Sequence, residues 1–387
     1  MSALNLSKAS RSVSLLPEAA KMLQARTRTI ICTEKDSQGT IGYRWGGAGA
    51  ERRRVGRAGV VAAAARREKP DRPTFGQKSG DALEGDFAHF PPLERRAVGG
   101  LGRGMNGEVG VRRGERRFSG RDFSSKVKRK RIMFVEDSLS LNQWQSFTCI
   151  LLVAVPSVSY TSVRTRGLST FTFSEYKTKV MFSRNAFLVD TVNKSKGAVL
   201  KLDSIEGGKL WKGIDVLIFN TWHWWLHTGR KQPWNFIQEG NNVYQDMDRL
   251  VAYEKALNTW AKWVDTNVHP AKTMVFFQGV SPDHNNGSDW GEDKARYCEG
   301  QKQPVSGPNY PAGPHAAELV VEKVLRGIQK PVYLLNVTAL SQLRKDGHPS
   351  VYGHGGPNDM DCSHWCLPAV PDTWNQLLYA LLLQFYN

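Results

Sequence analysis

Ser138 follows a short apolar segment, residues 132–135, at a point where a helical pattern begins. A serine at a strand-to-helix turn lies at the carboxyl edge of a sheet, next to free helix N–H groups that can stabilise an oxyanion. Ser138 is therefore a candidate nucleophile for acyl transfer. The alternative is an ordinary helix N-cap, a position that both Asp137 and Ser138 suit.

Asp361 and His364 are three residues apart in a polar segment just before the last helical pattern. At this spacing the carboxylate can bind one imidazole nitrogen and leave the other free as a general base for a serine hydroxyl. The pair is a candidate for the other two members of a hydrolytic triad. A surface hydrogen bond between the two side chains is the alternative.

Asn220 and His223 come directly after the apolar segment 216–219, together with Trp222, Trp224 and Trp225. An asparagine at the carboxyl end of a strand can donate to an oxyanion, and tryptophan faces can contact sugar rings. A tryptophan-rich core turn is the alternative.

The elements around these residues predict an α/β fold. Segments with the length of buried strands are residues 132–135, 216–219, 274–277 and 332–335, and segments with helical periodicity are residues 247–264, 316–328 and 377–383. Alternating strands and helices imply a parallel sheet with helices on both faces. Active sites in such sheets lie at the carboxyl ends of the strands.

The basic charge of the chain is concentrated at its start. Residues 1–130 hold 28 of the 53 Lys and Arg and 13 of the 36 Asp and Glu, a net charge of +15 out of +17. Eleven of the twelve tryptophans follow this region. We predict a mostly disordered basic region over residues 1–127 and a catalytic domain over residues 128–387. We expect no nucleic acid partner, although an RNA-binding tail is the alternative interpretation of the arginines.

The five cysteines suit a secreted disulfide framework rather than a metal site. Cys362, His364 and Cys366 are closely spaced, but no second C-x-x-C pair completes a tetrahedral zinc site. We predict disulfides among the cysteines of the folded part, with Cys32 left over and no pairing assigned. The sequence has no apolar stretch long enough to span a membrane and no evident signal peptide.

Four ordered motifs resemble the SGNH hydrolases and, more closely, the plant trichome birefringence-like family with its PC-esterase domain. They are Asp-Ser-Leu-Ser-Leu-Asn-Gln-Trp-Gln at 137–145, Asn-Thr-Trp-His-Trp-Trp at 220–225, Arg-Lys-Asp-Gly-His-Pro-Ser at 344–350 and Asp-Cys-Ser-His-Trp-Cys-Leu-Pro at 361–368. The resemblance implies an SGNH-like fold. It also implies Ser138 as nucleophile.

For the remaining site residues, the resemblance implies His364 as base, Asp361 as its orienting partner and Asn220 in the oxyanion hole. His223 is a further candidate for the oxyanion or substrate site. The segment that contains Arg344, Asp346 and His348 either contacts the glycan or holds its own loop.

The resemblance implies an O-acetyltransferase that acts on a cell-wall polysaccharide, xylan or a related glycan, with no bound cofactor and an acetyl donor such as acetyl-CoA as co-substrate. A Golgi location and membrane association are implied by the resemblance alone. A pectin or polysaccharide acetylesterase is the alternative.

Glu136 departs from the family pattern, which has Gly-Asp-Ser at this turn. Glycine tolerates positive φ, so we expect Glu136 to strain the turn and to oppose the oxyanion. A catalytically impaired polysaccharide-binding relative is therefore a further alternative. Exposure of Glu136 to solvent would make it harmless.

Overall fold

The computed structural model describes residues 32–35, 41–43, 120–155, 158–165, 167–353 and 360–386. These belong to one compact unit, residues 1–46 and 107–387, whereas a second unit, residues 47–106, lies outside the described residues. Strands β1 (Cys32–Lys35) and β2 (Ile41–Tyr43) pair antiparallel in a sheet of their own. Apart from these two strands and residues 120–127, the region predicted to be disordered, residues 1–127, lies outside the described residues.

A seven-stranded sheet forms the centre of the fold, in the order β13-β12-β9-β3-β6-β5-β4. Five strands run parallel, and all four strands expected from the sequence are among them: β3 (Arg131–Glu136), β6 (Thr178–Arg184), β9 (Val216–Phe219), β12 (Met274–Gln278) and β13 (Tyr333–Leu335). The α/β class with a mostly parallel sheet is therefore confirmed.

Two antiparallel strands extend this sheet at one edge, β4 (Tyr160–Thr165) and β5 (Leu168–Phe173). No sequence pattern predicted these two strands. Only short turns separate β4, β5 and β6, too short for the crossover that a parallel connection needs, so consecutive strands must run antiparallel.

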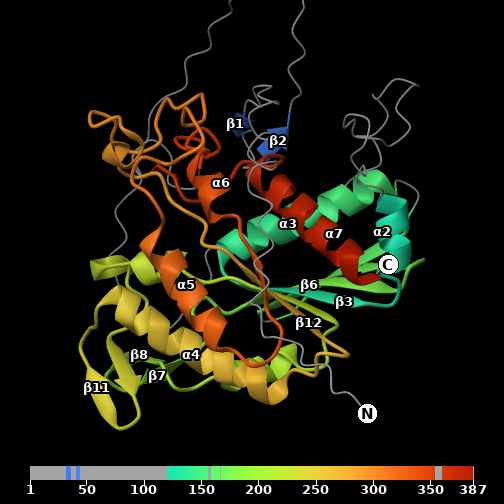
Figure 1. The fold of residues 1–387 in the computed structure, drawn as a ribbon, viewed down its shortest axis with the longest axis horizontal. Coiled ribbons are helices and arrows are strands. Elements are labelled where there is room, and N and C mark those ends of the chain that lie inside the picture. Colours follow the sequence, from blue (N-terminus) through green and yellow to red (C-terminus); the bar gives the residue numbers. More distant parts are fainter. Residues whose placement is uncertain are drawn as a thin grey trace, which may run out of the picture. The chain divides into compact units, whose positions relative to one another are not determined.

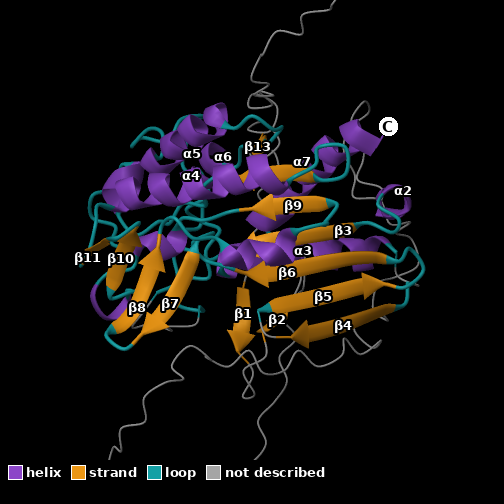
Figure 2. Ribbon diagram, turned by 90° about the horizontal axis from the view of Figure 1, so that it is seen from below, coloured by secondary structure: helices purple, strands orange, loops and turns teal. Residues whose placement is uncertain are grey.

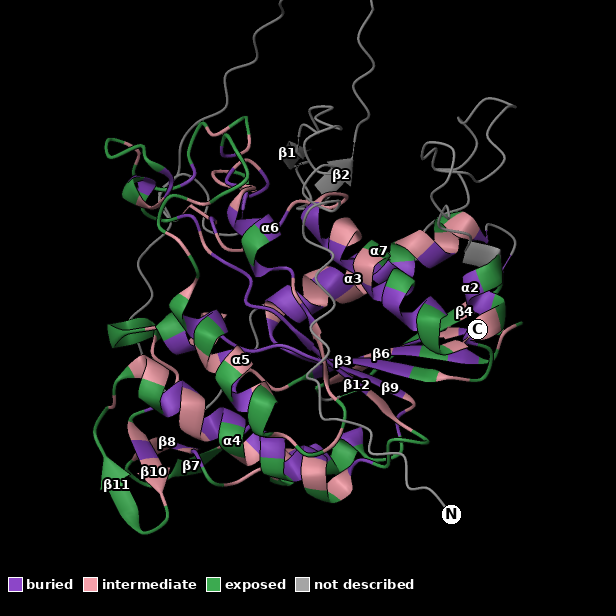
Figure 3. Ribbon diagram, in the orientation of Figure 1, coloured by how far each residue is buried: buried purple, intermediate pink, exposed green. Residues whose placement is uncertain are grey.

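Helices cover both faces of the sheet, as predicted (Figure 1). One face packs against α3 (Ser138–Ala154) and α7 (Val370–Tyr386), and the other against α4 (Arg249–Asn267) and α5 (Ala316–Gly327). The alternation of side chains along β3 explains this division. Ile132 and Phe134 belong to the core beneath α3 and α7, whereas Met133 and Val135 belong to the core beneath α4 and α5. Figure 3 shows β3 and β9 as buried between these layers.

Helix α2 (Gly120–Lys126) lies before residue 128, the expected start of the folded domain. Phe123 and Val127 are buried, and the Phe123 ring meets the rings of Phe147 and Tyr379 edge-on at centroid distances of 5.7 and 5.2 Å. The packed fold therefore includes residues that the sequence analysis assigned to the basic region.

A second sheet of four strands has the order β11-β10-β8-β7 and lies apart from the first in Figure 2. Its strands are β7 (Asp190–Lys194), β8 (Gly197–Lys201), β10 (Phe236–Glu239) and β11 (Asn242–Tyr244). It contacts α4, because Thr259 donates to the Leu202 carbonyl and Lys255 pairs with Glu239 at 2.7 Å. The remaining short helices are α6 (Thr338–Gln342) and the 3-10 turns Glu206–Trp211, His223–Leu226, Gly229–Lys231 and Gly287–Trp290.

A disulfide joins Cys298 to Cys362, and Cys366 is also disulfide-bonded. The predicted disulfide framework is confirmed, and these thiols are not available to zinc. Cys149 is exposed and free, which corrects the expectation that the cysteines of the folded part pair among themselves. In the part of the chain that the structure describes, no helix is both long and apolar enough to cross a membrane.

Candidate active site

Ser138 is the first residue of α3, directly after β3 ends at the carboxyl edge of the sheet. The preceding residue, Asp137, is the helix N-cap, and its side chain accepts from the Leu139 N–H at 2.8 Å. The capping interpretation therefore applies to Asp137, and it leaves the Ser138 hydroxyl available to a different partner. Ser138 is partly exposed.

That partner is His364, whose Nε2 lies 2.6 Å from Ser138 Oγ. On the other side of the ring, His364 Nδ1 lies 3.0 Å from both carboxylate oxygens of Asp361. The structure thus brings together all three residues of the predicted triad, although 226 residues separate Ser138 from His364. The side chain of His364 remains 26% exposed, so a substrate can reach the ring.

The electrostatics of the pair suit a general base. Burial lowers the pKa of His364, but the hydrogen bond and charge of Asp361 outweigh it and place the pKa above its ordinary value. Burial raises the pKa of Asp361, but the hydrogen bond and charge of His364 outweigh this, and the carboxyl pKa is well below its usual range. Asp361 therefore stays ionised and can stabilise the imidazolium that forms when His364 takes a proton.

Asn220 follows β9 at the same edge of the sheet, and its N–H donates to the Val135 carbonyl at 3.3 Å. This backbone contact holds it beside the end of β3, the strand that leads into Ser138. The side chain is buried, and its amide Nδ2 has no hydrogen-bond partner among the described residues. An unpaired amide donor at this position can serve a developing oxyanion.

His223 begins the 3-10 turn after Asn220, and its ring centroid lies 6.0 Å from that of His364. Burial lowers the pKa of His223, so it is neutral at pH 7. The burial of the neighbouring tryptophans corrects the prediction that all three rings can contact sugar rings. Trp222 and Trp225 are buried in the core, and among the three only Trp224 keeps a partly exposed ring, which Arg184 covers at 5.4 Å.

Arg344 and Asp346 pair with each other, through contacts of 2.8 and 3.2 Å. His348 is buried, and its Nδ1 lies 2.7 Å from the backbone carbonyl of His364. Of the two roles left open for this segment, the contacts support holding the loop. His348 contacts the main chain of the triad histidine and is covered from solvent.

Several residues that support the site were missed by the sequence analysis. Trp365 N–H donates to Asn142 Oδ1 at 3.2 Å, which ties the triad loop to α3, and Trp365 Nε1 donates to Ser281 Oγ at 2.8 Å. His284 is buried against His348, with the two rings 2.6 Å apart at His284 Nδ1 and His348 Nε2. The available signal was position, because Ser281 and His284 follow the predicted strand 274–277 at the same carboxyl edge.

Glu136 is completely buried, which excludes the alternative that it turns outward into solvent. Its Oε1 accepts from the Trp222 N–H at 3.3 Å, and its Oε2 has no partner among the described residues. Burial, and then the charge of Asp137, raise the pKa of Glu136 well above its ordinary value. Its φ is 159°, a positive value at the boundary between the region that favours glycine and extended backbone.

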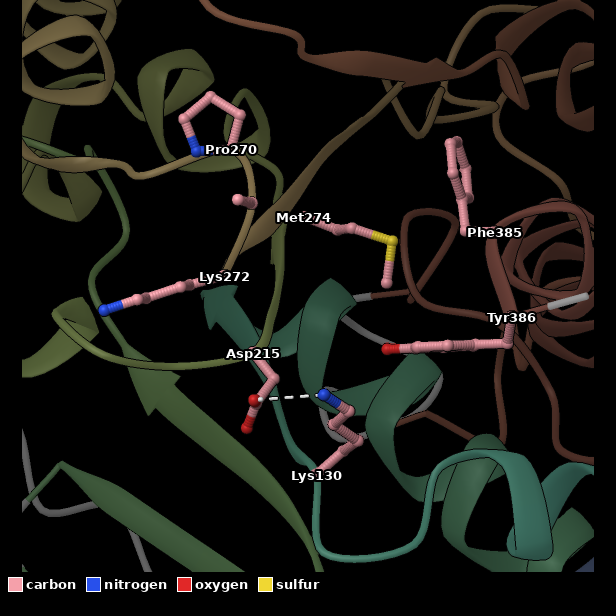
Figure 4. A pocket seen from close by; sticks show the side chains of 8 residues that line it. Lys130, Asp215, Pro270, Lys272, Met274, Phe385 and Tyr386 are labelled. Carbon is pink, nitrogen blue, oxygen red and sulfur yellow. Dashed lines mark ion pairs between the residues drawn. The ribbon is translucent and has the colours of Figure 1, made fainter.

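A pocket of about 250 Å³ lies at the opposite, amino-terminal edge of the sheet (Figure 4). Its lining includes Lys130, which precedes β3, Asp215, which precedes β9, and Met274, the first residue of β12. Lys130 and Asp215 pair at 3.5 Å. The triad lies where β3 ends, so this pocket is not part of the candidate active site.

Comparison with known proteins shows the family of this chain. Residues 116–381 match the PC-Esterase family, described as a GDSL/SGNH-like acyl-esterase family found in Pmr5 and Cas1p. From Arabidopsis thaliana, trichome birefringence-like 43 is 58% identical over 269 residues, which cover 69% of this chain and 73% of that protein. Trichome birefringence-like 42 is 53% identical, over 69% of this chain and 74% of that protein, and protein trichome birefringence is 39% identical, over 70% and 48%.

Proposed function

Because this chain belongs to the PC-esterase family that includes the trichome birefringence-like proteins, we propose that it is a polysaccharide O-acetyltransferase. Membership of a GDSL/SGNH-like acyl-esterase family supports acyltransferase or esterase chemistry in general. The observation that carries the proposal is the 2.6 Å contact between His364 Nε2 and Ser138 Oγ, with Asp361 on the other ring nitrogen.

In the first half-reaction, Ser138 Oγ attacks the carbonyl carbon of the acetyl donor while its proton passes to His364 Nε2. The carbonyl oxygen becomes an oxyanion, toward which Asn220 Nδ2 and the first N–H groups of α3 are the available donors. When the intermediate collapses, the bond to the leaving group breaks and His364 returns the proton to it. The acetyl group remains on Ser138 as an ester.

In the second half-reaction, a sugar hydroxyl attacks the Ser138 ester while His364 removes its proton. The C–O bond to Ser138 breaks, and the serine recovers a proton from His364. The product is an O-acetylated glycan. Water in place of the sugar gives free acetate, so the same residues serve the acetylesterase alternative.

The proposed acceptor is xylan or a related cell-wall glycan, and the proposed donor is an activated acetyl compound such as acetyl-CoA, with no bound cofactor. Golgi residence is part of the same proposal. Trp224, four residues after Asn220, is partly exposed, and the face of its ring that Arg184 does not cover is the proposed surface for a sugar ring.

A test compares purified wild-type protein with Ser138→Ala on unacetylated xylan oligosaccharides plus acetyl-CoA, and on acetylated xylan and pectin fragments without donor. Mass spectrometry counts the acetyl groups. Acetyl gain that needs Ser138 supports the transferase, whereas acetate release without donor assigns the esterase. Full activity in Ser138→Ala excludes the covalent mechanism. For Asn220→Ala we expect a loss on the order of 10² to 10³ in rate, the effect of one oxyanion donor.

A second candidate, a catalytically impaired glycan-binding relative, is favoured by the burial of Glu136 two residues before Ser138. Burial and Asp137 raise the pKa at which Glu136 ionises, and once ionised it opposes an oxyanion at the adjacent turn. Binding of xylan fragments without acetyl gain or loss in either assay supports this candidate.

A further inference from the structure

Two histidines lie in contact behind the candidate triad. His284, from the segment after β12, is 0% exposed, and His348, from the loop after α6, is 8% exposed. His284 Nδ1 and His348 Nε2 are 2.6 Å apart. Neither ring contacts Ser138, so the pair does not take part in the chemistry directly.

The outer nitrogen of each ring faces a backbone carbonyl. His284 Nε2 lies 2.8 Å from the Gln342 oxygen, and His348 Nδ1 lies 2.7 Å from the His364 oxygen. A carbonyl oxygen can only accept, so each of these nitrogens must carry a hydrogen. The contact between the two rings requires one more hydrogen on one of its nitrogens. Three contacts therefore require three ring protons.

Two neutral imidazoles carry only two ring protons. A neutral pair would leave either two lone pairs facing each other at 2.6 Å or a ring nitrogen facing a carbonyl without a hydrogen. Both rings are buried, where an unmade hydrogen bond costs more than at the surface. We propose that His284 and His348 share one additional proton and act as a positively charged positioning pair for His364.

The surroundings of the pair offer compensation for this charge. Taken alone, each ring has a pKa below its ordinary value, and that of His348 is well below it, because burial is the largest influence. Against burial, hydrogen bonds to the Gln342 and His364 carbonyls raise the pKa of His284 and His348. Carboxylates act in the same direction: Asp283, Asp346 and Asp289 on His284, and Asp361 on His348.

Positive charges near the pair oppose its protonation. His364 lowers the pKa of His348 when it is charged, and Arg344 is paired with Asp346. Aromatic rings also surround the pair. Trp365 stacks on His348 at a centroid distance of 4.2 Å, and Trp290 and Tyr310 lie beside His284 at 5.5 and 6.1 Å. Aromatic faces stabilise a cation that has left water.

A shared proton has a defined effect on stability. For the pair to stay charged in the folded protein, this compensation must hold the third proton to a higher pH than in an exposed histidine, whose pKa is about 6.5. The stabilisation is therefore present at low pH and is lost as the pH rises above this value. Loss of the proton breaks one of the three contacts, one of which holds the carbonyl of His364.

The matched variant is His284→Asn. The asparagine amide can present either oxygen or N–H to His348, so its contact is satisfied whether His348 is charged or neutral. We expect the unfolding equilibrium constant of the wild type, divided by that of His284→Asn, to rise between pH 6.5 and 8.5 by up to tenfold per pH unit. Urea unfolding measures this ratio. A ratio that is constant or falls over this range overturns the proposal.

A second measurement needs no variant. In the wild type, ¹⁵N-histidine NMR at pH 6 should show three protonated nitrogens for the buried pair, and two would overturn the proposal. Neither measurement depends on activity, so the shared proton can be overturned while the proposed function holds, and the reverse. Only the positioning role for His364 rests on the proposed function. If acyl transfer is found, the wild-type kcat should fall at alkaline pH, and this fall should be absent in His284→Asn.

Discussion

Glu136 combines complete burial with a carboxylate oxygen that has no partner among the described residues. Its pKa is raised well above the ordinary value, first by burial and then by Asp137. Because the folded-state pKa is raised, the contribution of Glu136 to the free energy of unfolding is complete below about pH 4.5, the ordinary pKa of a glutamate. This contribution is lost as the pH rises through the folded-state pKa. Glu136 therefore destabilises the fold increasingly toward neutral and alkaline pH.

We predict that Glu136→Gln, which cannot ionise, becomes more stable relative to the wild type as the pH rises above about 4.5. The gain in the free energy of unfolding is up to about 1.4 kcal/mol per pH unit until the folded-state pKa is reached. Urea unfolding at pH 4.5 and pH 8 measures it. The control is Glu299→Gln at an exposed position. A stability difference that is equal at both pH values would contradict the prediction.

Glu136→Gly tests the effect of the same residue on chemistry. Within the proposed mechanism, we expect faster hydrolysis of an activated acetyl ester by the variant, with a gain that grows with pH as Glu136 ionises. An ionised carboxylate opposes the oxyanion, and about 1.4 kcal/mol of opposition slows the reaction tenfold. Equal rates at pH 8, in proteins of equal thermal stability, would show that Glu136 does not impair the site.

The pairing of Asp361 with His364 predicts how the reaction rate depends on pH. His364 must be neutral to act as a base, and its pKa is above the ordinary value because of Asp361. We expect kcat/KM to fall tenfold per pH unit on the acid side of this raised pKa.

Asp361→Asn should lower kcat by on the order of 10⁴ and also move the acid limb to lower pH, because the carboxylate that raises the His364 pKa is gone. The pH–rate profile for an activated ester measures both effects. An unchanged acid limb in Asp361→Asn would mean that another group sets it.

Helix α2 is the element that extends the fold beyond its expected start. Phe123 is completely buried against Phe147 and Tyr379, which are on α3 and α7. We predict that Phe123→Ala lowers the free energy of unfolding by about 3–5 kcal/mol, the cost of truncating a buried phenylalanine. Phe385→Ala, on the partly exposed end of α7, is the matched control and should cost less.

A comparison of two shortened chains tests α2 as a whole. A chain that starts at residue 116 keeps α2, whereas a chain that starts at residue 128 loses it. We expect a higher Tm for the longer chain by differential scanning calorimetry. Equal Tm values would mean that α2 adds nothing to the stability of the fold.

The disulfide between Cys298 and Cys362 joins two residues that are 64 positions apart in the sequence. Cys362 directly follows Asp361 of the candidate triad. A loop of this length predicts a loss of about 4 kcal/mol in the free energy of unfolding for the double variant Cys298→Ala/Cys362→Ala. Urea unfolding measures the loss. Cys149→Ser, at the exposed free cysteine, should change stability little. A double variant as stable as Cys149→Ser would contradict this prediction.

The amino-acid sequence by itself determined the α/β class, the four central strands, the main helices and the candidate triad. Buried strands and amphipathic helices have local hydrophobic patterns, and β9 matches the predicted segment 216–219 residue for residue. Ser138, Asn220 and the segment with Asp361 and His364 were identified because chain order places them at one edge of a parallel sheet.

Only the tertiary structure decided which distant segments meet. His284 and His348 are 64 residues apart, and no local pattern predicts that their rings touch. The same holds for the pairing of Cys298 with Cys362 and for the edge strands β4 and β5. The burial of Glu136 also depends on Trp222 and the core around it, which belong to other elements. Hydrophobic periodicity sets which face of an element is buried, whereas the partner across that face is set by the packing of the whole chain.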